Sequence, residues 1–380
     1  MIIVADENIP LLDSFFSDLG EIRRVSGRSL SPADVKDADL LLVRSVTSVN
    51  QALLNGSSVR FVGTATIGTD HIDTDYLNKA GIGFANAPGC NAQAVVDYVL
   101  SALSVLIDTR DLSFGELSVG IVGVGNVGGL LRKRLEALGV TVKAVDPYKD
   151  PEEVGELVAL EEALTCDLIS LHTPMVRTGD HPTWHMIGEA ELKAMKPDAC
   201  LINTCRGAVV DNDALYAHLT DHMEFEVVLD VWENEPELNT ALMELCMLAT
   251  PHIAGYSLDG KMRGTEMIYQ AVSEFFGIPI RRKLAQFLPE PGIKRVNFTD
   301  QVPFNQALRT AIRASYEIRV DDGKMRQAMR RATDLKTAFD KLRSSYPLRR
   351  DIPAMRVGVP AKCSELQDLL SAAGFDVRNK

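Results

Sequence analysis

The sequence has few of the features that mark membrane, secreted or disulfide-bonded proteins. Its 380 residues contain no window that approaches the ~18 consecutive apolar residues of a membrane span. The first residues, Met1–Glu7, carry no basic group before their apolar run, so we expect a strand there and not a signal peptide. The six cysteines are scattered and form no C-x-x-C pair, which favours reduced thiols over disulfides or a zinc site. We therefore expect a cytoplasmic protein with no membrane partner.

Aromatic residues are scarce at 6%, and the net charge of -12 is unevenly distributed. From Arg281 onward there are 21 Lys and Arg residues and 11 Asp and Glu residues, whereas the preceding part has 19 and 41. A basic tail can bind nucleic acid, but this one has few aromatic side chains to interleave with its charges. We therefore expect no nucleic-acid partner, and favour a solvated helical face or a surface that docks on an acidic partner subunit.

The remaining composition is that of an ordinary globular protein, long enough for two or three domains. The first 95 or so residues alternate apolar strands with helical stretches, which predicts a parallel sheet with helices on its faces. A second alternating region begins at Ser118, and its six strands suit a doubly wound fold. The expected strands are Ile2–Ala5, Leu40–Arg44, Arg60–Thr64 and Gly83–Ala85 in the first region, and Val119–Val122, Val142–Val145, Leu168–Leu171, Cys200–Asn203, Val227–Asp230 and Met247–Ala249 in the second.

A glycine-rich turn follows the first strand of the second region. Gly123, Gly125 and Gly128 form a G-x-G-x-x-G pattern just before the helix expected at Leu130–Leu138. Glycines at this spacing permit a tight turn, let the backbone approach a pyrophosphate, and let the helix pack on its strand. Asp146 ends the next strand, about twenty residues on, where an acid binds ribose hydroxyls and disfavours a 2′-phosphate. The pattern predicts NAD as the cofactor.

Two long helical runs are expected to carry the chain between the first two domains. They are Ala92 to about Asp108 and Met262–Phe276. We therefore predict a Rossmann-type NAD-binding domain of residues 95–255, beside a flavodoxin-like substrate (lid) domain of residues 1–94 and 256–281. Prolines punctuate residues 282–380, which read as two basic helical runs, Phe304–Arg319 and Met325–Ser344, followed by strand, helix and strand. We predict a small α/β domain there, for subunit association.

Three ionisable residues come just after three successive strands of the second region. They are Arg206, Glu235 and His252. The carboxyl ends of parallel strands meet at one crevice, so the three side chains are expected to share a site. Each of the three, taken singly, is also typical of a surface or structural position. Together, a carboxylate that orients an imidazole, an imidazole that moves a proton and a guanidinium that holds a carboxylate are what hydride transfer beside a carboxylate requires.

These segments resemble the NAD-dependent D-2-hydroxyacid dehydrogenase family. The resemblance runs from the glycine loop through Asn203–Leu215, Leu229–Pro236 and Thr250–Gly255, and more loosely over the first 280 residues. The resemblance is stronger to one branch of this family. Members of that branch oxidise 4-phosphoerythronate in vitamin B6 biosynthesis and form homodimers through a C-terminal extension similar in length to residues 282–380. The segments that indicate this branch are Val43–Thr47, Thr64–His71, Gly179–Thr183 and His252–Ser257.

The resemblance implies a role for each matching residue. His252 would be the acid/base, Glu235 would hold its imidazole, and Arg206 would bind the substrate carboxylate and polarise the forming carbonyl. Asp230 would contact the nicotinamide side of the cofactor. The other positions implied for NAD are Gly123, Gly125, Asn126, Val127, Gly128, Asp146, Thr173, Thr204, Cys205 and Gly255, and those implied for substrate are Ser45, Thr66 and Tyr256.

Several questions stay open at this level. The same motifs are also typical of another dehydrogenase, such as one acting on 3-phosphoglycerate, or of a non-catalytic NAD-sensing regulator.

No metal site is expected. Pro182 disfavours a helix that would place His181 and His185 on one face, and the pair His218 and His222 lacks a third ligand. A substrate phosphate needs cationic partners, and we expect the basic tail to supply one across a dimer. The candidates are Arg44, Lys261, Arg263, Arg349 and Arg350.

Overall fold

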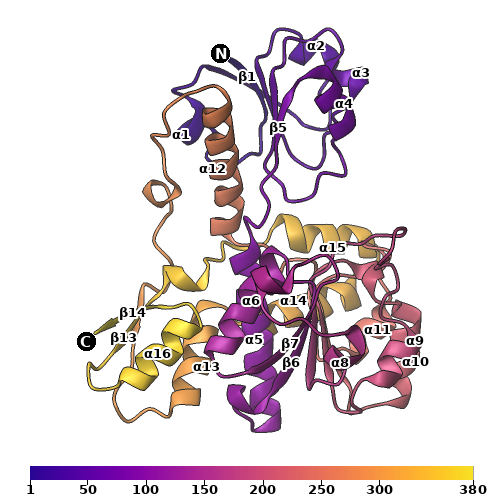
Figure 1. The fold of residues 1–380 in the computed structure, drawn as a ribbon, viewed down its shortest axis with the longest axis vertical. Helices are drawn as coiled ribbons and strands as arrows, with labels where there is room; N and C mark the ends of the chain where they lie inside the picture. The colour runs from indigo at the N-terminus through magenta and orange to yellow at the C-terminus, as the bar shows by residue number, and fades with distance from the viewer. Residues whose placement is uncertain (380) are drawn as a thin grey trace. The chain divides into compact units, whose positions relative to one another are not determined.

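Alternating strands and helices form parallel sheets throughout residues 1–379, which is the part of the chain that the structure, a computed structural model, describes (Figure 1). The chain divides into two units. The first contains Met1–Asn91 and Ser257–Glu290, and the second contains Ala92–Tyr256 and the residues from Pro291 onward. The predicted α/β class with two doubly wound parallel sheets is confirmed.

The first unit has a five-stranded sheet in the order β2-β1-β3-β4-β5, which is the flavodoxin-like order. Sequence reasoning missed the edge strand β2, because its residues Glu21–Val25 are charged and partly exposed in place of an apolar run. The other strands are β1 (Ile2–Asp6), β3 (Leu40–Val43), β4 (Phe61–Thr64) and β5 (Gly83–Ala85), and the short helices are α1 (Leu12–Phe16), α2 (Pro32–Val35), α3 (Gln51–Leu54) and α4 (Thr74–Ala80).

Helix α12 (Leu258–Phe275) brings the chain back to this first sheet. Its Ile268, Tyr269 and Val272 are buried in the same apolar core as β1 and β3. The approach is close at Gly63 in β4, where an added Cβ would lie 2.5 Å from Ile268 Cγ2. Glycine at this position therefore lets the helix lie directly on the strand. The one-turn 3₁₀ helix η3 (Leu284–Gln286) follows.

The second unit has a six-stranded sheet in the order β7-β6-β8-β9-β10-β11. This order differs from the 3-2-1-4-5-6 order of many dinucleotide-binding sheets, and instead extends the pattern of the first unit. The strand order reverses between β6 and β8, which places a ligand crevice at their carboxyl ends. The strands are β6 (Ser118–Val122), β7 (Thr141–Val145), β8 (Leu168–Leu171), β9 (Cys200–Asn203), β10 (Glu226–Leu229) and β11 (Leu248–Ala249). The intervening helices are η1 (Phe114–Glu116), α6 (Asn126–Ala137), α7 (Pro151–Val154), α8 (Leu160–Ala163), α9 (Glu189–Ala194), η2 (Gly207–Val209), α10 (Asn212–Asp221) and α11 (Thr240–Leu245).

Helix α5 (Ala92–Arg110) is long and apolar enough, with a mean hydropathy of 1.3, to satisfy the composition test for a membrane span. The helix has no long run of consecutive apolar residues, because polar side chains such as Asp97, Ser101 and Ser104 interrupt it. In the structure 83% of the 18-residue window that meets the test is buried inside the unit, as in the core helix of a globular protein. The helix packs against α6 and against α13 (Phe304–Ser315), so its apolar residues face protein on several sides.

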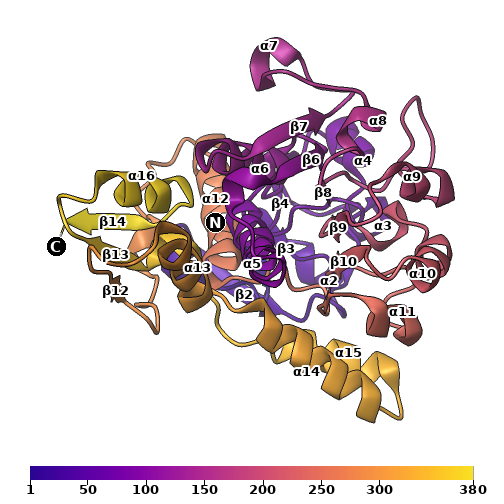
Figure 2. The same ribbon diagram turned by 90° about the horizontal axis from the view of Figure 1, so that it is seen from below.

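The residues from Pro291 onward share the core of the second unit. Three helices are present where the sequence predicted two, because the chain breaks after α13 and again after α14, and the residues predicted to separate the two runs lie within α14. The first break is at Tyr316. There Ser101 of α5 donates to the Tyr316 carbonyl (2.9 Å) and accepts from the Ile318 amide (3.2 Å). Figure 2 shows α14 and α15 side by side, and α16 beside the small sheet β12-β13-β14. These elements are α14 (Ile318–Arg331), α15 (Leu335–Ser344), η4 (Ile352–Ala354), α16 (Ser364–Ala372), β12 (Arg295–Asn297), β13 (Arg356–Val359) and β14 (Asp376–Asn379).

Candidate functional site

The glycine loop follows β6 at the point where the strand order reverses. Gly123 has a φ of 95°, and a Cβ there would lie 2.8 Å from the His172 carbonyl oxygen. At Gly128 a Cβ would lie 1.9 Å from the Gly123 carbonyl oxygen, so the first turn of α6 packs directly on the loop. A Cβ at Gly125 would meet no described atom within 4 Å. The first and third glycines are thus needed for packing, whereas the second leaves room for a ligand beside the backbone.

Asp146 lies beside this loop at the end of β7. Its Oδ2 accepts from the Val124 amide (2.9 Å), and its Oδ1 accepts from the Tyr148 amide (3.0 Å). Each carboxylate oxygen keeps further acceptor capacity for a ribose hydroxyl. A cavity of about 630 Å³ opens next to it. Among the residues that line the cavity are Gly123, Gly125, Asp146, Pro147, Tyr148, His172, Thr173, Pro174 and Thr183.

His172 is a lining residue that sequence reasoning missed. It follows β8 directly, so its place at a strand end was the available signal. Burial alone lowers the pKa of His172 to about 3, and the imidazole is therefore neutral at physiological pH. Its Nε2 lies 2.9 Å from Ser170 Oγ.

Arg206 is positioned by the chain that leaves β9. The Asn203 side chain binds the Arg206 carbonyl (3.0 Å) and accepts from the Cys205 amide (3.1 Å). The Arg206 side chain is exposed, and its Nη1 donates to the Cys205 carbonyl (2.7 Å). At Gly207 a Cβ would lie 2.0 Å from the Trp232 carbonyl oxygen, so the loops after β9 and β10 are in direct contact. Thr204, in the same turn, has a buried Oγ1 with no hydrogen-bond partner in the described part of the chain.

The structure brings Glu235 and His252 together. Glu235 Oε2 lies 2.8 Å from His252 Nδ1, and Glu235 Oε1 accepts from the Trp232 amide (2.7 Å). The two side chains are 19% and 34% exposed, so the pair is accessible to a small molecule. His252 has a φ of 58°, a left-handed conformation that is uncommon outside glycine.

The buried carboxylate of Asp230 supports that unusual backbone. It accepts hydrogen bonds from the Ile253 amide (2.7 Å) and the Ala254 amide (2.8 Å), and from Thr250 Oγ1 (2.6 Å). The Asp230 carbonyl also accepts from the His252 amide (2.7 Å). Burial raises the pKa of Asp230, whereas nearby His252 and these hydrogen bonds act to lower it. Sequence reasoning did not foresee this supporting role.

A second carboxylate and imidazole group lies just before Glu235. His185 Nε2 lies 2.8 Å from Glu233 Oε1, and His185 Nδ1 lies 3.5 Å from Asp211 Oδ2. One ligand atom from each of the three lies within 4.8 Å of the others, the arrangement of a metal-binding group. Each member already makes a hydrogen bond or ion pair, and Asp211 also caps α10. The cluster therefore ties three loops together at the turn that leads to Glu235.

The implied substrate residues lie in both units. Ser45 and Thr66 follow β3 and β4, which pair with each other in the first unit. In the second unit, the Tyr256 hydroxyl accepts from Arg343 Nη2 (3.0 Å). The expectation that Arg349 reaches a substrate phosphate is wrong, because its side chain is buried and donates to two backbone carbonyls.

Two family models match the chain. One, described as the NAD binding domain of D-isomer specific 2-hydroxyacid dehydrogenases, matches residues 108–254. The other, a domain of unknown function, matches residues 287–374. Among curated proteins, the erythronate-4-phosphate dehydrogenase of Marinobacter nauticus is 54% identical over 100% of both chains. Proteins of that name from Pseudomonas putida (50% identity, 98% of this chain and 99% of the relative) and Hahella chejuensis (48% identity, 100% of both) are also similar.

Solved structures resemble about three quarters of the chain. A D-lactate dehydrogenase from Aquifex aeolicus, complexed with NAD and lactic acid, has a TM-score of 0.57 and 26% identity, and covers 73% of this chain and 96% of its own. A D-isomer specific 2-hydroxyacid dehydrogenase from Lactobacillus delbrueckii ssp. bulgaricus, in an NAD-complexed form, has a TM-score of 0.62 and 22% identity, covering 74% and 99%. The second likeness shows the fold alone.

Two adjacent glycines provide a matched test of the loop. Gly128→Ala should lower the free energy of unfolding by about 1–3 kcal/mol, because its Cβ would overlap the Gly123 carbonyl. Gly129→Ala should be neutral or stabilising by about 0.5–1 kcal/mol, because a Cβ there would meet its nearest atom at 3.7 Å and alanine favours helix. Urea unfolding measures both; equal stability of the two variants would contradict the packing described.

Proposed function

Because the chain belongs to the family of erythronate-4-phosphate dehydrogenases, a branch of the D-isomer specific 2-hydroxyacid dehydrogenases, we propose that it oxidises 4-phospho-D-erythronate with NAD. The product would be 2-oxo-3-hydroxy-4-phosphobutanoate, on the route to pyridoxal 5′-phosphate. The observation that carries the proposal is the 2.8 Å contact between Glu235 Oε2 and His252 Nδ1. A carboxylate that fixes one imidazole nitrogen leaves the other to exchange a proton with substrate.

Proton transfer is the task proposed for this pair. His252 Nε2 accepts the proton of the C2 hydroxyl as the C2–H bond breaks, and the C2–O bond becomes a carbonyl. The imidazolium formed is stabilised by Glu235 at Nδ1. Arg206, exposed at the neighbouring strand end, binds the substrate carboxylate and stabilises negative charge on the carbonyl oxygen.

The second unit also has the residues to hold NAD, which accepts the hydride from C2 when bound. Amides at the start of α6 suit the pyrophosphate, and Asp146 suits the ribose hydroxyls of the adenosine. The buried Thr204 hydroxyl without a partner in the described chain supports a ligand beside Arg206. The remaining cofactor contacts proposed are Asn126, Val127, Thr173, Cys205, Asp230 and Gly255.

Ser45, Thr66 and Tyr256 are proposed to contact the substrate. Ser45 and Thr66 follow adjacent strands of the first unit. The Thr66 hydroxyl donates to the Gly68 carbonyl (3.0 Å) in this structure, so it would exchange that bond for one to a substrate anion. Arg44 also follows β3, but its Nε already binds the buried carboxylate of Asp6 (3.0 Å). The choice between a phosphorylated sugar acid and an unphosphorylated one rests on the relatives, which are similar over the full chain.

We also propose a cytoplasmic homodimer that associates through the C-terminal region. The support is a set of large apolar side chains that are exposed there, which are Leu348, Val320, Ile293 and Phe304.

The positive charge of the C-terminal region does not indicate a nucleic-acid partner, because many of its arginines form ion pairs with acidic side chains of the same chain. Arg326 binds Asp322, Arg330 binds Glu244, and Arg309 and Arg313 bind Asp108.

Sedimentation tests the assembly. The protein should sediment as a dimer at micromolar concentration, and Leu348→Glu, which adds a charge to a side chain that is 77% exposed, should shift it toward monomer. Met223→Glu is the matched control, because that side chain is 93% exposed on the NAD-binding unit. A wild-type monomer, or a dimer that neither variant weakens, would contradict association through this surface.

The substrate is tested by NADH formation across a panel of acids. We expect turnover with 4-phosphoerythronate, at a kcat/KM at least 100-fold above those for 3-phosphoglycerate and unphosphorylated erythronate. A site built to bind a polar group rejects analogues that lack it; unphosphorylated erythronate lacks the phosphate, and 3-phosphoglycerate is one carbon shorter and lacks the C3 hydroxyl. Preference for 3-phosphoglycerate would favour the related dehydrogenase. NADH binding without oxidation of any acid would favour a regulator that senses the cofactor.

The proton-transfer pair is tested by three variants. His252→Asn should lower kcat by about 10²–10⁴-fold, and asparagine tolerates the left-handed backbone, so NADH affinity should stay within about threefold. Glu235→Gln should cost less, because the imidazole remains but loses its charged partner. The exposed His222→Ala, after α10, is the control and should keep full activity. Turnover by His252→Asn at the wild-type rate would eliminate the assignment.

A further inference from the structure

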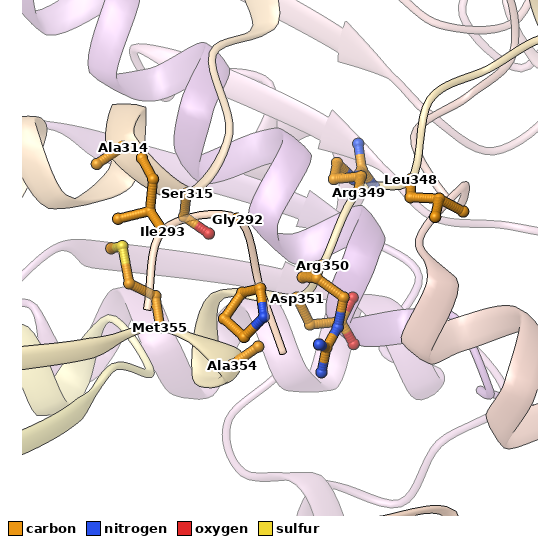
Figure 3. Close-up of a pocket in the computed structure, with 11 residues that line it drawn as sticks. Gly292, Ile293, Ala314, Ser315, Leu348, Arg349, Arg350, Asp351, Ala354 and Met355 are labelled. Carbon is orange, nitrogen blue, oxygen red and sulfur yellow. The ribbon is translucent and has the colours of Figure 1, made fainter. Parts of the chain in front are cut away.

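Arg349 is a buried arginine in the segment between α15 and η4. Its side chain is 7% exposed, although its neighbour Leu348 is 77% exposed. Figure 3 shows Arg349 and Arg350 along the same segment with side chains that point in opposite directions, at the edge of a cavity of about 240 Å³. An extended backbone alternates its side chains in this way, so one arginine of the pair faces the interior.

The guanidinium of Arg349 joins two separate elements of the second unit. Nη2 donates to the Ala94 carbonyl in the first turn of α5 (3.1 Å) and to the Ala254 carbonyl. The group also lies 4.3 Å from the centroid of the Tyr316 ring, which keeps it in place by a cation–π contact. A residue of the C-terminal region thus reaches the turn that contains His252, two residues before Ala254.

That turn is then held from both sides. On one side Asp230 accepts from the amides of Ile253 and Ala254, and on the other Arg349 donates to the carbonyl of Ala254. The left-handed backbone of His252 (φ 58°) persists only where surrounding contacts hold it. A change in the position of the Ala254 carbonyl would therefore be passed to the imidazole.

The charge of Arg349 is compensated nearby, which explains how it can be buried. Burial acts to lower the pKa of Arg349, but Tyr316, Tyr346, Asp97 and Asp351 outweigh it and raise the pKa above its usual value. Asp97 is itself fixed by hydrogen bonds from Gln93 Nε2 (2.7 Å) and the Ile352 amide (2.7 Å). The guanidinium is therefore a permanent charge in a fixed frame.

We propose that Arg349 is a positioning residue for proton transfer, through which the C-terminal region sets the orientation of His252. The inference rests on the proposed function, because it assigns Arg349 to the same proton-transfer site. It also gives this region a task within one protomer, separate from association between protomers.

Arg349→Lys keeps the charge but has a shorter reach and no planar fork, so it should lose the Ala254 contact. We expect kcat to fall about 10–100-fold, since small misplacements of a catalytic group are costly. The KM for substrate and the Kd for NADH should change less than threefold. Hydrogen exchange of the Ile253 and Ala254 amides should accelerate, because the turn is held from one side only.

Arg326→Lys is the matched control. Arg326 also lies in the C-terminal region and donates to two backbone carbonyls, those of Met243 (2.9 Å) and Cys246 (2.7 Å), and it binds Asp322. The two carbonyls precede β11, and none of these three contacts lies in the 252–254 turn. We expect a comparable loss of thermal stability with kcat within twofold of wild type and unchanged exchange at Ile253 and Ala254.

The outcomes separate this inference from the proposed function. Wild-type protein that oxidises none of the acids overturns the function, while exchange at Ile253 and Ala254 still reports whether Arg349 holds the turn. Active wild type with Arg349→Lys at full kcat and unchanged exchange overturns the inference alone. Should Arg349→Lys fail to fold, Tyr316→Leu removes the ring under the guanidinium without changing charge. It should lower kcat about 3–10-fold, and full kcat with unchanged exchange would again overturn the inference.

Discussion

A buried carboxylate, that of Asp230, accepts hydrogen bonds from Thr250 and from the amides of Ile253 and Ala254 at the end of β10. These bonds satisfy backbone donors that the left-handed turn at His252 would otherwise leave unpaired in the interior. The same turn places the imidazole against Glu235. Without the carboxylate of Asp230, the segment after β11 would lack the hydrogen bonds that determine its direction. The imidazole of His252 would then not be held against Glu235.

The interaction extends into an otherwise apolar helix. Thr250 Oγ1, which binds Asp230, also lies 2.7 Å from the Tyr98 hydroxyl of α5, and the Tyr98 and Tyr316 rings stack. Asp97 and Ser101 of α5 bind the amide of Ile352 and the chain break around Tyr316. Polar groups of this largely apolar helix thus form hydrogen bonds with the C-terminal region. This explains why that region shares one unit with the NAD-binding sheet.

Much of the fold was predictable where local pattern and final environment agree. The strands β8 and β9 were predicted to the residue, because each is a run of four buried residues of which three are apolar. The edge strand β2 was missed, since a charged strand lacks that pattern. The break at Tyr316 was missed because it is stabilised by Ser101, more than 200 residues earlier. No window around Tyr316 contains that partner.

The sequence by itself determined the chemistry available to this protein. Arg206, Glu235 and His252 at strand ends, with Gly123, Gly128 and Asp146, identify the site because parallel strands bring their carboxyl ends together whatever the detailed packing. Only the tertiary structure decided what holds these groups. Asp230 was expected at the cofactor and Arg349 at a substrate phosphate. In the structure both side chains also form hydrogen bonds with the turn that contains His252. The reason is physical: the partner of a buried charge depends on which distant backbone groups share its interior, and local sequence does not contain that information.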